Sequence, residues 1–148
     1  MHNLVAITTA AQVSDLALGR LYDGGQQPSL DFLINLLARP AGQTWAISGP
    51  EGVKGVVWYS VVEDEAEIID IRVAQHHRRR GLGELLLAQS LEKLRLLKIR
   101  SVFLEVKSSN DGALALYTKL GFEIIGRRHN YYETPSGRED ALTMSYQW

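Results

Sequence analysis

The spacing of apolar residues changes from segment to segment along the chain, and this spacing predicts alternating strands and helices. After a short apolar run at Leu4–Ile7, apolar residues recur at helical spacing in two segments. The first follows Thr8-Thr9, which suit a helix cap, and stops near Asp23-Gly24-Gly25. The second begins at Pro28 and ends at Arg39-Pro40. We therefore expect one strand followed by two short helices.

The next part of the chain reads as three strands joined by tight turns. Gly49-Pro50-Glu51-Gly52 and Asp64-Glu65 carry turn residues between apolar, β-branched runs. The runs are Thr44–Ser48, Val53–Glu63 and Ala66–Val73. Strands joined in this way predict an antiparallel meander.

A strand-helix-strand unit follows. Leucines at helical spacing predict a helix over Gly83–Leu97, and the apolar run Ser101–Lys107 predicts a strand after it. Because a connection of this length is a crossover, this strand should lie parallel to Ala66–Val73. Asn110–Leu120 predicts a further helix, with Gly121 as its left-handed stop.

Two last strands are expected at Phe122–Arg128 and Ala141–Tyr146, joined by a polar loop around Pro135-Ser136-Gly137. The expected fold class is α/β (α+β). Four helices should pack on a mixed, mostly antiparallel, twisted sheet of about six or seven strands. No repeat or long linker divides the 148 residues, so we expect residues 1–148 to form a single domain.

Composition narrows the classes of function. With 45% apolar and 22% charged residues, the chain has an ordinary globular composition. The absence of cysteine excludes disulfides, thiolate metal ligands and a cysteine nucleophile. A net charge of −1 gives no broad attraction to nucleic acid, and no apolar stretch is long enough to span a membrane. We expect a soluble, cytoplasmic protein without a metal, whose four histidines lie on the surface or in loops.

The strongest chemical signal is a basic, glycine-containing turn between a predicted strand and a predicted helix. It reads Arg78-Arg79-Arg80-Gly81-Leu82-Gly83. Three arginines alone are more often a solvated charge run. At the start of a helix, however, glycines leave backbone N–H groups free to bind an anionic phosphate. The turn therefore predicts a phosphate site.

With this turn, the chain resembles the GCN5-related N-acetyltransferase (GNAT) superfamily. The turn matches the family signature Arg/Gln-x-x-Gly-x-Gly/Ala, and a second signature is matched by Asn110–Ala113 and Ala115–Phe122. The resemblance covers about residues 65–147 and implies acetyl-CoA as co-substrate. It also implies that the two parallel strands splay apart to admit the cofactor.

The resemblance assigns the donor site residue by residue. The pyrophosphate would lie on the turn, bound by Arg78, Arg79, Arg80, Gly81, Leu82, Gly83 and the backbone amide of Glu84. The pantetheine arm would pair with the strand edge Ile71-Arg72-Val73, where the Val73 amide would face the thioester carbonyl. Asn110 would hold the cofactor near the second helix, unless it serves only as that helix's cap.

Two residues match the family's catalytic pair. Glu105, the only acidic residue in an apolar strand core, matches the general base, and Tyr117 matches the general acid. Each also has a plainer interpretation. Glu105 could project to solvent from a half-exposed strand, and Tyr117 could be a core aromatic residue with its hydroxyl at the rim.

Within the superfamily the chain is most similar to the RimI-type group, which acetylates the N-terminal alanine of ribosomal protein bS18. The tail carries this likeness through Asn130-Tyr131-Tyr132 and Gly137–Met144. Tyr131 or Tyr132 could line an acceptor cleft. The usual aromatic-Pro-Trp segment between the first two helices is replaced by Tyr22–Pro28. Acetylation of a small-molecule amine or a lysine therefore stays open, as does a coenzyme A-binding module without turnover.

Overall fold

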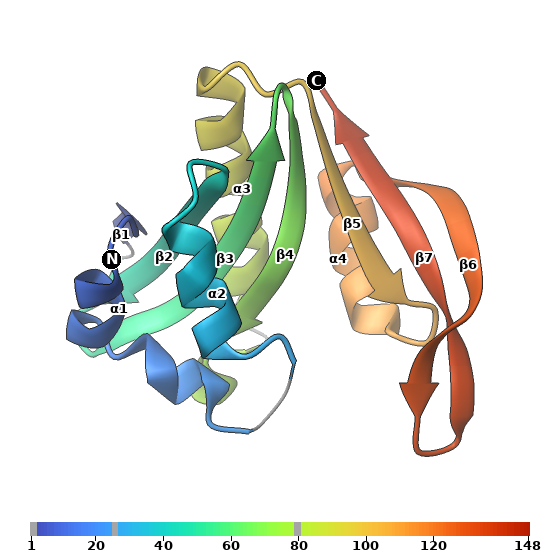
Figure 1. The fold of residues 1–148 in the computed structure, drawn as a ribbon, viewed down its shortest axis with the longest axis horizontal. Coiled ribbons are helices and arrows are strands. Elements are labelled where there is room, and N and C mark those ends of the chain that lie inside the picture. The colour runs from blue at the N-terminus through green and yellow to red at the C-terminus, as the bar shows by residue number, and fades with distance from the viewer. Residues whose placement is uncertain (1–2, 25–26, 79–80) are drawn as a thin grey trace.

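The computed structural model describes residues 3–24, 27–78 and 81–148. In this part of the chain, seven strands form one sheet in the order β1-β2-β3-β4-β5-β7-β6 (Figure 1). The strands are β1 (Asn3–Ala6), β2 (Gly42–Gly49), β3 (Gly52–Val62), β4 (Glu65–Val73), β5 (Ser101–Lys107), β6 (Glu123–Thr134) and β7 (Gly137–Gln147). Only β4 and β5 pair in parallel among the described strands. The expected mixed, mostly antiparallel sheet is confirmed.

The first helical segment is broken in two, which the sequence did not predict. Helix α1 (Ala10–Asp15) ends early because Ala17 adopts a left-handed conformation with φ 54°, and a 3₁₀ helix, η1 (Leu18–Tyr22), follows. The break directs Leu18 into the core, where it is fully buried. Thr9 caps α1 as expected, accepting a hydrogen bond from the Gln12 amide.

Helix α2 (Leu30–Leu37) begins after Pro28 rather than at it. The side chain of Ser29 accepts a hydrogen bond from the Phe32 amide at 3.2 Å and so caps the helix. Pro28 precedes the cap, so the prediction that it occupies the first helical turn is wrong.

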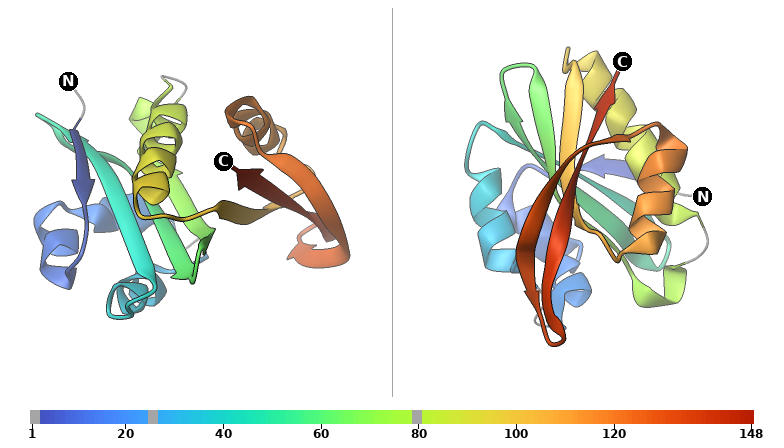
Figure 2. Two further views of the ribbon diagram at one scale, coloured as in Figure 1. Left: turned by 90° about the horizontal axis from the view of Figure 1, so that it is seen from above. Right: turned by 90° about the vertical axis from the view of Figure 1, so that its right-hand side faces the viewer.

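Helices α3 (Leu82–Leu96) and α4 (Asp111–Leu120) lie within a residue or two of their predicted bounds. Gly121 ends α4 with φ 107°, as expected. The turn between the last two strands lies at Pro135 and Ser136, where the sequence predicted it, but both strands were predicted too short, because β6 continues to Thr134 and β7 begins at Gly137. The far end of this hairpin projects from the rest of the sheet (Figure 2), and the β6 strand is mostly exposed, so its sequence shows no buried face, whereas β7 buries Ala141, Leu142 and Met144.

The helices cover both faces of the sheet. Helices α1 and α2 lie on one face and α3 and α4 on the other (Figure 2). Trp58 anchors the core under α1 and α2, and Leu86, Leu87 and Leu94 of α3 pack in the core on the other face. Because strand side chains alternate between faces, β4 and β5 contribute apolar groups to the α3 face and present others toward α2.

The two parallel strands separate after a short paired stretch. β4 and β5 are in register only from Glu65 opposite Ser101 to Glu67 opposite Phe103. Beyond this point they diverge (Figure 1), so the later residues of β4 have no neighbouring strand on that side within the described chain. The expected splay is confirmed.

Candidate active site

A cleft of about 1360 Å³ opens where β4 and β5 separate. Residues from both strands, from the turn before α3, from α4 and from β6 line it. Eight residues predicted from the sequence contribute to the lining: Ile71, Val73, Arg78, Gly83, Glu105, Asn110, Tyr117 and Tyr132. The fold thus brings together side chains that are up to 61 residues apart, from Ile71 to Tyr132.

The free edge of β4 presents backbone amides to the cleft. Ala74 donates to Lys54 O at 2.8 Å, so this pair of residues holds the end of β4 to β3. Because successive strand amides point to opposite sides, the amides of Val73 and Ile71 point away from β3, toward the cleft. They can therefore pair with an extended, peptide-like ligand.

The start of α3 forms the anion-binding end of the site. Gly81 caps the helix in a left-handed conformation with φ 75°, and its carbonyl accepts the first intrahelical bond, from the Leu85 amide at 3.0 Å. The amides of residues 82–84 precede that bond and have no intrahelical acceptor. Arg79 and Arg80, both predicted phosphate ligands, lie outside the described residues.

Three other predicted donor-site residues have partners within the protein. The Arg78 Nε donates to Val73 O at 3.1 Å, so the arginine lies along the strand edge. Glu84 forms an ion pair with Lys119 at 3.0 Å. The Asn110 side chain accepts from the Ala113 amide at 3.2 Å. Its capping role is therefore present, and it still lines the cleft.

Glu105 enters the cleft from β5 on the face that α2 covers. Its side chain is 23% exposed, so it lies neither in the core nor in bulk water. Its Oε1 lies 3.2 Å from Nη2 of Arg128, which extends from β6. The carboxylate is thus held by an arginine that our sequence analysis did not assign to the site.

Tyr117 reaches the cleft from α4 on the other side of the sheet. The residue is only 7% exposed, and its ring packs edge-on against Phe122 at 5.7 Å. Burial, with a smaller contribution from the Asp70 carboxylate, raises the pKa of Tyr117 to about 12. No other described residue hydrogen-bonds its hydroxyl, which leaves the proton available to a group in the cleft.

The two tyrosines of the tail have different positions. Tyr132 lines the cleft, with the Lys107 Nζ 5.6 Å from its ring centroid. Tyr131 lies outside the cleft lining, is 49% exposed, and packs between Tyr132 and the Arg128 guanidinium. Of the two candidates for the acceptor site, the structure places Tyr132 in the cleft.

A wide bulge in β6 produces this arrangement. Arg128 is opposite Ala141 and Tyr132 is opposite Glu139, so β6 has two residues more than β7 over this stretch. The Asp140 carboxylate binds the bulge, accepting from the Asn130 amide at 2.9 Å and from Arg127 at 2.7 Å. The bulge lets Arg128 reach Glu105 while Tyr132 faces the cleft.

Asp70 is a second acidic residue in the cleft, also missed in the sequence. It accepts hydrogen bonds from Tyr22 and Arg72. The Arg72 side chain therefore points toward η1 and α2, and its amide, which alternates with those of Ile71 and Val73, points toward β3. Nothing in the alternating pattern of β4 marks Asp70, because the bulge at Ile69 changes the face on which the next residues lie.

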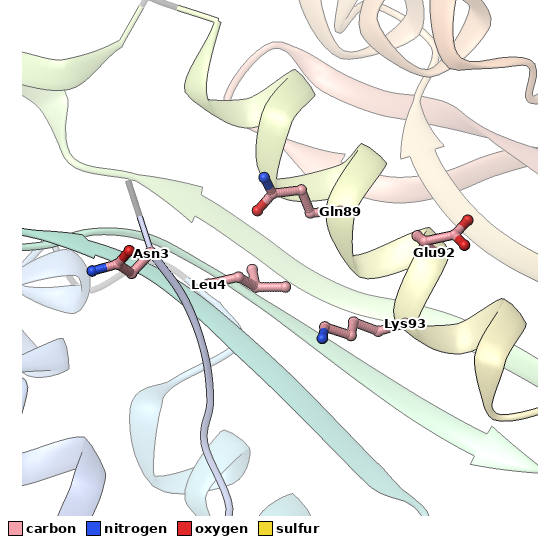
Figure 3. A pocket seen from close by; sticks show the side chains of 5 residues that line it. All are labelled: Asn3, Leu4, Gln89, Glu92 and Lys93. Atoms are coloured by element: carbon pink, nitrogen blue, oxygen red, sulfur yellow. The ribbon is translucent and has the colours of Figure 1, made fainter. Parts of the chain in front are cut away.

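A second hollow, of about 390 Å³, lies between β1 and α3 (Figure 3). Asn3, Leu4, Gln89, Glu92 and Lys93 line it, and none of them was predicted to belong to a site. Across the described residues, no group of His, Asp or Glu side chains could hold a metal ion. His77, which was expected on the surface or in a loop, lies in the short 3₁₀ turn Gln75–His77 between β4 and α3, but it is buried there, with 6% exposed.

These positions define what the cleft can do chemically. One end offers helix amides and glycines to a phosphate, and the edge of β4 offers amides to an extended arm. A carboxylate from β5 and a neutral phenol from α4 then line the same cleft. This arrangement suits the transfer of an activated acyl group to a nucleophile that must lose a proton. No helix among the residues described here is long and apolar enough to cross a membrane.

Comparisons with known proteins agree with this geometry. The chain is 44% identical over 85 residues to the [ribosomal protein bS18]-alanine N-acetyltransferase of Escherichia coli strain K12, which is 57% of each protein. The chain therefore matches little more than half of that relative's length in sequence. The crystal structure of the ribosomal-protein-S18-alanine N-acetyltransferase from E. coli superposes with a TM-score of 0.85 and 28% identity, covering 99% of this chain and 94% of that one.

A nourseothricin acetyltransferase superposes less fully, with a TM-score of 0.65 and 31% identity, over 73% of this chain and 66% of that one. The model of the acetyltransferase (GNAT) family matches residues 10–122. This range includes the turn before α3, the splayed strands, Glu105 and Tyr117. The chain belongs to the acetyltransferase (GNAT) family.

Proposed function

We propose that the protein is an acetyl-CoA-dependent N-acetyltransferase that acts on the N-terminal α-amine of a protein, as RimI-type enzymes do. The observation that carries the proposal is the position of Glu105 and Tyr117 in one cleft, between a helix N-terminus and a free strand edge. Glu105 lies on β5 and Tyr117 on α4, a strand and a helix that the sequence also predicted.

The donor would be held at the β4 edge and the α3 N-terminus. Acetyl-CoA supplies a thioester, which an amine can attack directly without a covalent enzyme intermediate. The amides of residues 82–84, with Arg78, would bind its pyrophosphate. The Val73 amide would stabilise negative charge as it develops on the carbonyl oxygen, and Asn110 would contact the cofactor beside α4.

Glu105 and Tyr117 would move the two protons of the reaction. Glu105 would accept the proton that the amine loses, directly or through a water molecule, as the N–C bond forms. Tyr117 would donate its proton to the thiolate that leaves when the C–S bond breaks. Since its pKa is raised to about 12, Tyr117 is protonated at neutral pH and can serve as an acid. The phenol would be restored with the proton held by Glu105.

The proposed acceptor is the N-terminal alanine of ribosomal protein bS18, which would place the enzyme in the cytoplasm. Support comes from the activity for which the E. coli relative is named and from the extent of the structural likeness. Tyr132, which ends the Asn130–Tyr132 segment that carries the resemblance in sequence, lines the cleft. An N-terminal amine has a pKa of about 7.7–8.0, against about 10.4 for lysine, so a carboxylate base suffices for it.

Steady-state acetylation of a peptide that begins Ala-Arg tests the proposal. We expect Glu105→Gln and Tyr117→Phe each to lower kcat by about 10²-fold or more, while acetyl-CoA still binds. Polyamines, aminoglycosides and lysine peptides, assayed beside the peptide, should react poorly. Full kcat in either variant would show that the substituted residue does not have the role assigned to it. If one of the other amines were preferred, that amine would be the acceptor instead. If acetyl-CoA bound but no amine were acetylated, the protein would be a coenzyme A-binding module rather than an enzyme.

A further inference from the structure

A network of polar side chains stands in the wall of the cleft opposite the β6–β7 hairpin. The Tyr22 hydroxyl donates to Oδ2 of Asp70 at 2.7 Å, and the Arg72 Nε donates to the same oxygen at 3.2 Å. The indole N–H of Trp58, whose side chain is fully buried, donates to the Tyr22 hydroxyl at 2.8 Å. One carboxylate thus organises three side chains from β3, β4 and η1.

Arg72 extends this network to the connection between η1 and α2. Its Nη1 donates to Leu21 O at 3.2 Å and its Nη2 to Pro28 O at 3.4 Å. The guanidinium also stacks over the Tyr22 ring, 4.0 Å from the centroid, and its side chain is only 10% exposed. One guanidinium, neutralised by Asp70, therefore binds both sides of this connection.

The end of this connection, from Gln27, and the first turn of α2 form one wall of the cleft. Pro28 and Phe32 line the cleft together with Asp70, while Glu105 and Tyr132 line it from β5 and β6. The bulge at Ile69 sets this geometry, because Trp58 is opposite Asp70 and Tyr59 is opposite Ile68. An acceptor that approaches Glu105 must pass between this wall and the hairpin.

The network is complete without a ligand, and it borders the predicted donor edge at Arg72 and at the Ile71 amide, which lies close enough to the Asp70 carboxylate to lower its pKa. Burial and the Asp70 carboxylate raise the pKa of Tyr22, so its hydroxyl remains a neutral donor. Burial raises the pKa of Asp70 overall, although Tyr22, Arg72 and the Ile71 amide oppose this shift. None of the side-chain hydrogen bonds of the network reaches Arg78, Gly83 or Asn110. A defect here should therefore affect the acceptor more than acetyl-CoA.

We propose that Asp70 is a positioning residue for the acceptor, which fixes the Pro28–Phe32 wall through Tyr22 and Arg72 and so determines which amines reach Glu105. The inference rests on the proposed acetyltransferase function. It assigns acceptor selection to a network that includes Tyr22 and the Pro28 carbonyl, the two ends of the segment that stands where the RimI-type group has a different sequence. A polypeptide N-terminus, which must lie extended along the wall, depends on it more than a small amine does.

Kinetics with both substrates test the proposal. Asp70→Asn keeps the shape but loses the charge that holds Arg72, and we expect the KM for an alanine-initiated peptide to rise about ten-fold. The KM for acetyl-CoA should change less than about two-fold, and the ratio of kcat/KM for the peptide over a small amine should fall. Tyr22→Phe should act in the same direction. Arg95→Gln removes a guanidinium that pairs with Glu92 on the surface of α3, and it should change neither constant.

Hydrogen exchange provides a readout that needs no acceptor. In Asp70→Asn, amides at Tyr22–Asp23 and at the start of α2 should exchange faster, while those of α4 should not change. Equal increases in both KM values, or an unchanged acceptor KM in a folded variant, would overturn the positioning role. Unchanged exchange would overturn the mechanical link. If the wild type acetylated no peptide but exchange still increased, the proposed function would fail and the bracing of this wall would stand.

Discussion

Tyr117 combines two properties at one position, since it is buried enough to hold its proton and placed so that its hydroxyl lines the cleft. Its ring packs on Phe122, and the nearby Asp70 carboxylate further disfavours a phenolate. A neutral phenol in such a site can donate a proton over the whole physiological range. The burial that would keep Tyr117 protonated for catalysis therefore also makes the stability of the protein depend on pH through this residue.

The stability of the protein should fall at alkaline pH partly because of Tyr117. Its folded pKa of about 12 lies above the unfolded value of 10.0. The stabilisation is therefore full below pH 10 and lost as pH rises to 12, by about 2–3 kcal/mol. Urea unfolding of the wild type and Tyr117→Phe from pH 8 to 11.5 checks this. The difference between them should be constant up to about pH 10 and then shift against the wild type. Tyr22 and Tyr59, whose pKa values are also raised, affect both proteins alike. A difference independent of pH would contradict the linkage.

Among single residues, the sequence predicted those whose proposed roles follow from a local sequence motif. Glu105 and Tyr117 were predicted from segments that match the family, and both lie in a regular strand or helix, where the spacing of residues determines the direction of each side chain. Arg128 and Asp70 were not found, because each is displaced by a bulge in its strand. A bulge changes the face of every later side chain and has no period of its own. The Arg128–Glu105 and Arg72–Asp70 pairs could therefore not be predicted without knowing the register of the strands.

Among the elements, the start of α3 contains two glycines with different physical reasons. Gly81 has φ 75°, which side-chain-bearing residues adopt at a cost. Gly83 lies in the helix and lines the cleft, and a Cβ there would meet only Leu116 at 3.6 Å and Val73 at 3.9 Å. The protein has room at residue 83 for a methyl group, whereas the proposed cofactor would need to approach the backbone closely there.

Replacing each glycine by alanine should separate these two reasons. Gly81→Ala should lower the free energy of unfolding by about 1–2 kcal/mol. Gly83→Ala should leave that free energy equal or higher, since alanine favours a helix, but raise the Kd for acetyl-CoA at least about ten-fold. Thermal unfolding and calorimetric titration measure the two quantities. Equal acetyl-CoA affinity in Gly83→Ala would show that the cofactor does not approach this turn.

The bulge of β6 offers a test of how the hairpin shapes the acceptor side. Asp140→Ala removes the acceptor of the Asn130 amide and the partner of Arg127. We expect faster hydrogen exchange at Asn130 and a lower kcat, because Arg128 would no longer be directed to Glu105. Acetyl-CoA affinity should not change. Glu133→Ala, which removes an exposed partner of Arg138 on the same hairpin, is the control and should leave the Asn130 exchange rate unchanged. If the Asn130 amide still exchanged slowly in Asp140→Ala, the bulge would keep its conformation without the Asp140 carboxylate.

Elements with a buried face were predicted almost to the residue, and those without one were not. The strand Ser101–Lys107 was correct at both ends because it is an apolar run bounded by polar residues on both sides. The β6–β7 hairpin was predicted too short because Arg127–Thr134 is almost entirely solvent-exposed and polar. The early end of α1 also escaped prediction, because Ala17 carries no signal for a left-handed conformation.

On the scale of the molecule, the sheet consists of two parts joined by the short β4–β5 pairing. β1–β4 pair with one another on one side, and β5, β7 and β6 on the other. The α3 core nevertheless includes residues from both parts, among them Tyr59 of β3 and Leu104 of β5. We propose on this basis that residues 1–148 form a single domain. Urea unfolding followed by tryptophan fluorescence and by circular dichroism should then give one coincident transition.

A ligand bound between the two parts should stabilise the whole molecule and protect the cleft edge selectively. Acetyl-CoA at 100 times its Kd should raise the free energy of unfolding by about 2.7 kcal/mol, since it binds only the folded state. Its arm would also pair with the free edge of β4, so hydrogen exchange at Ile71 and Val73 should slow beyond this global effect. Amides at the hairpin tip, Glu133 to Arg138, lie away from the cleft and serve as the internal control. Stabilisation without extra protection at Ile71 and Val73 would mean that the cofactor binds through the α3 turn alone, and the splay of the sheet would then need another explanation.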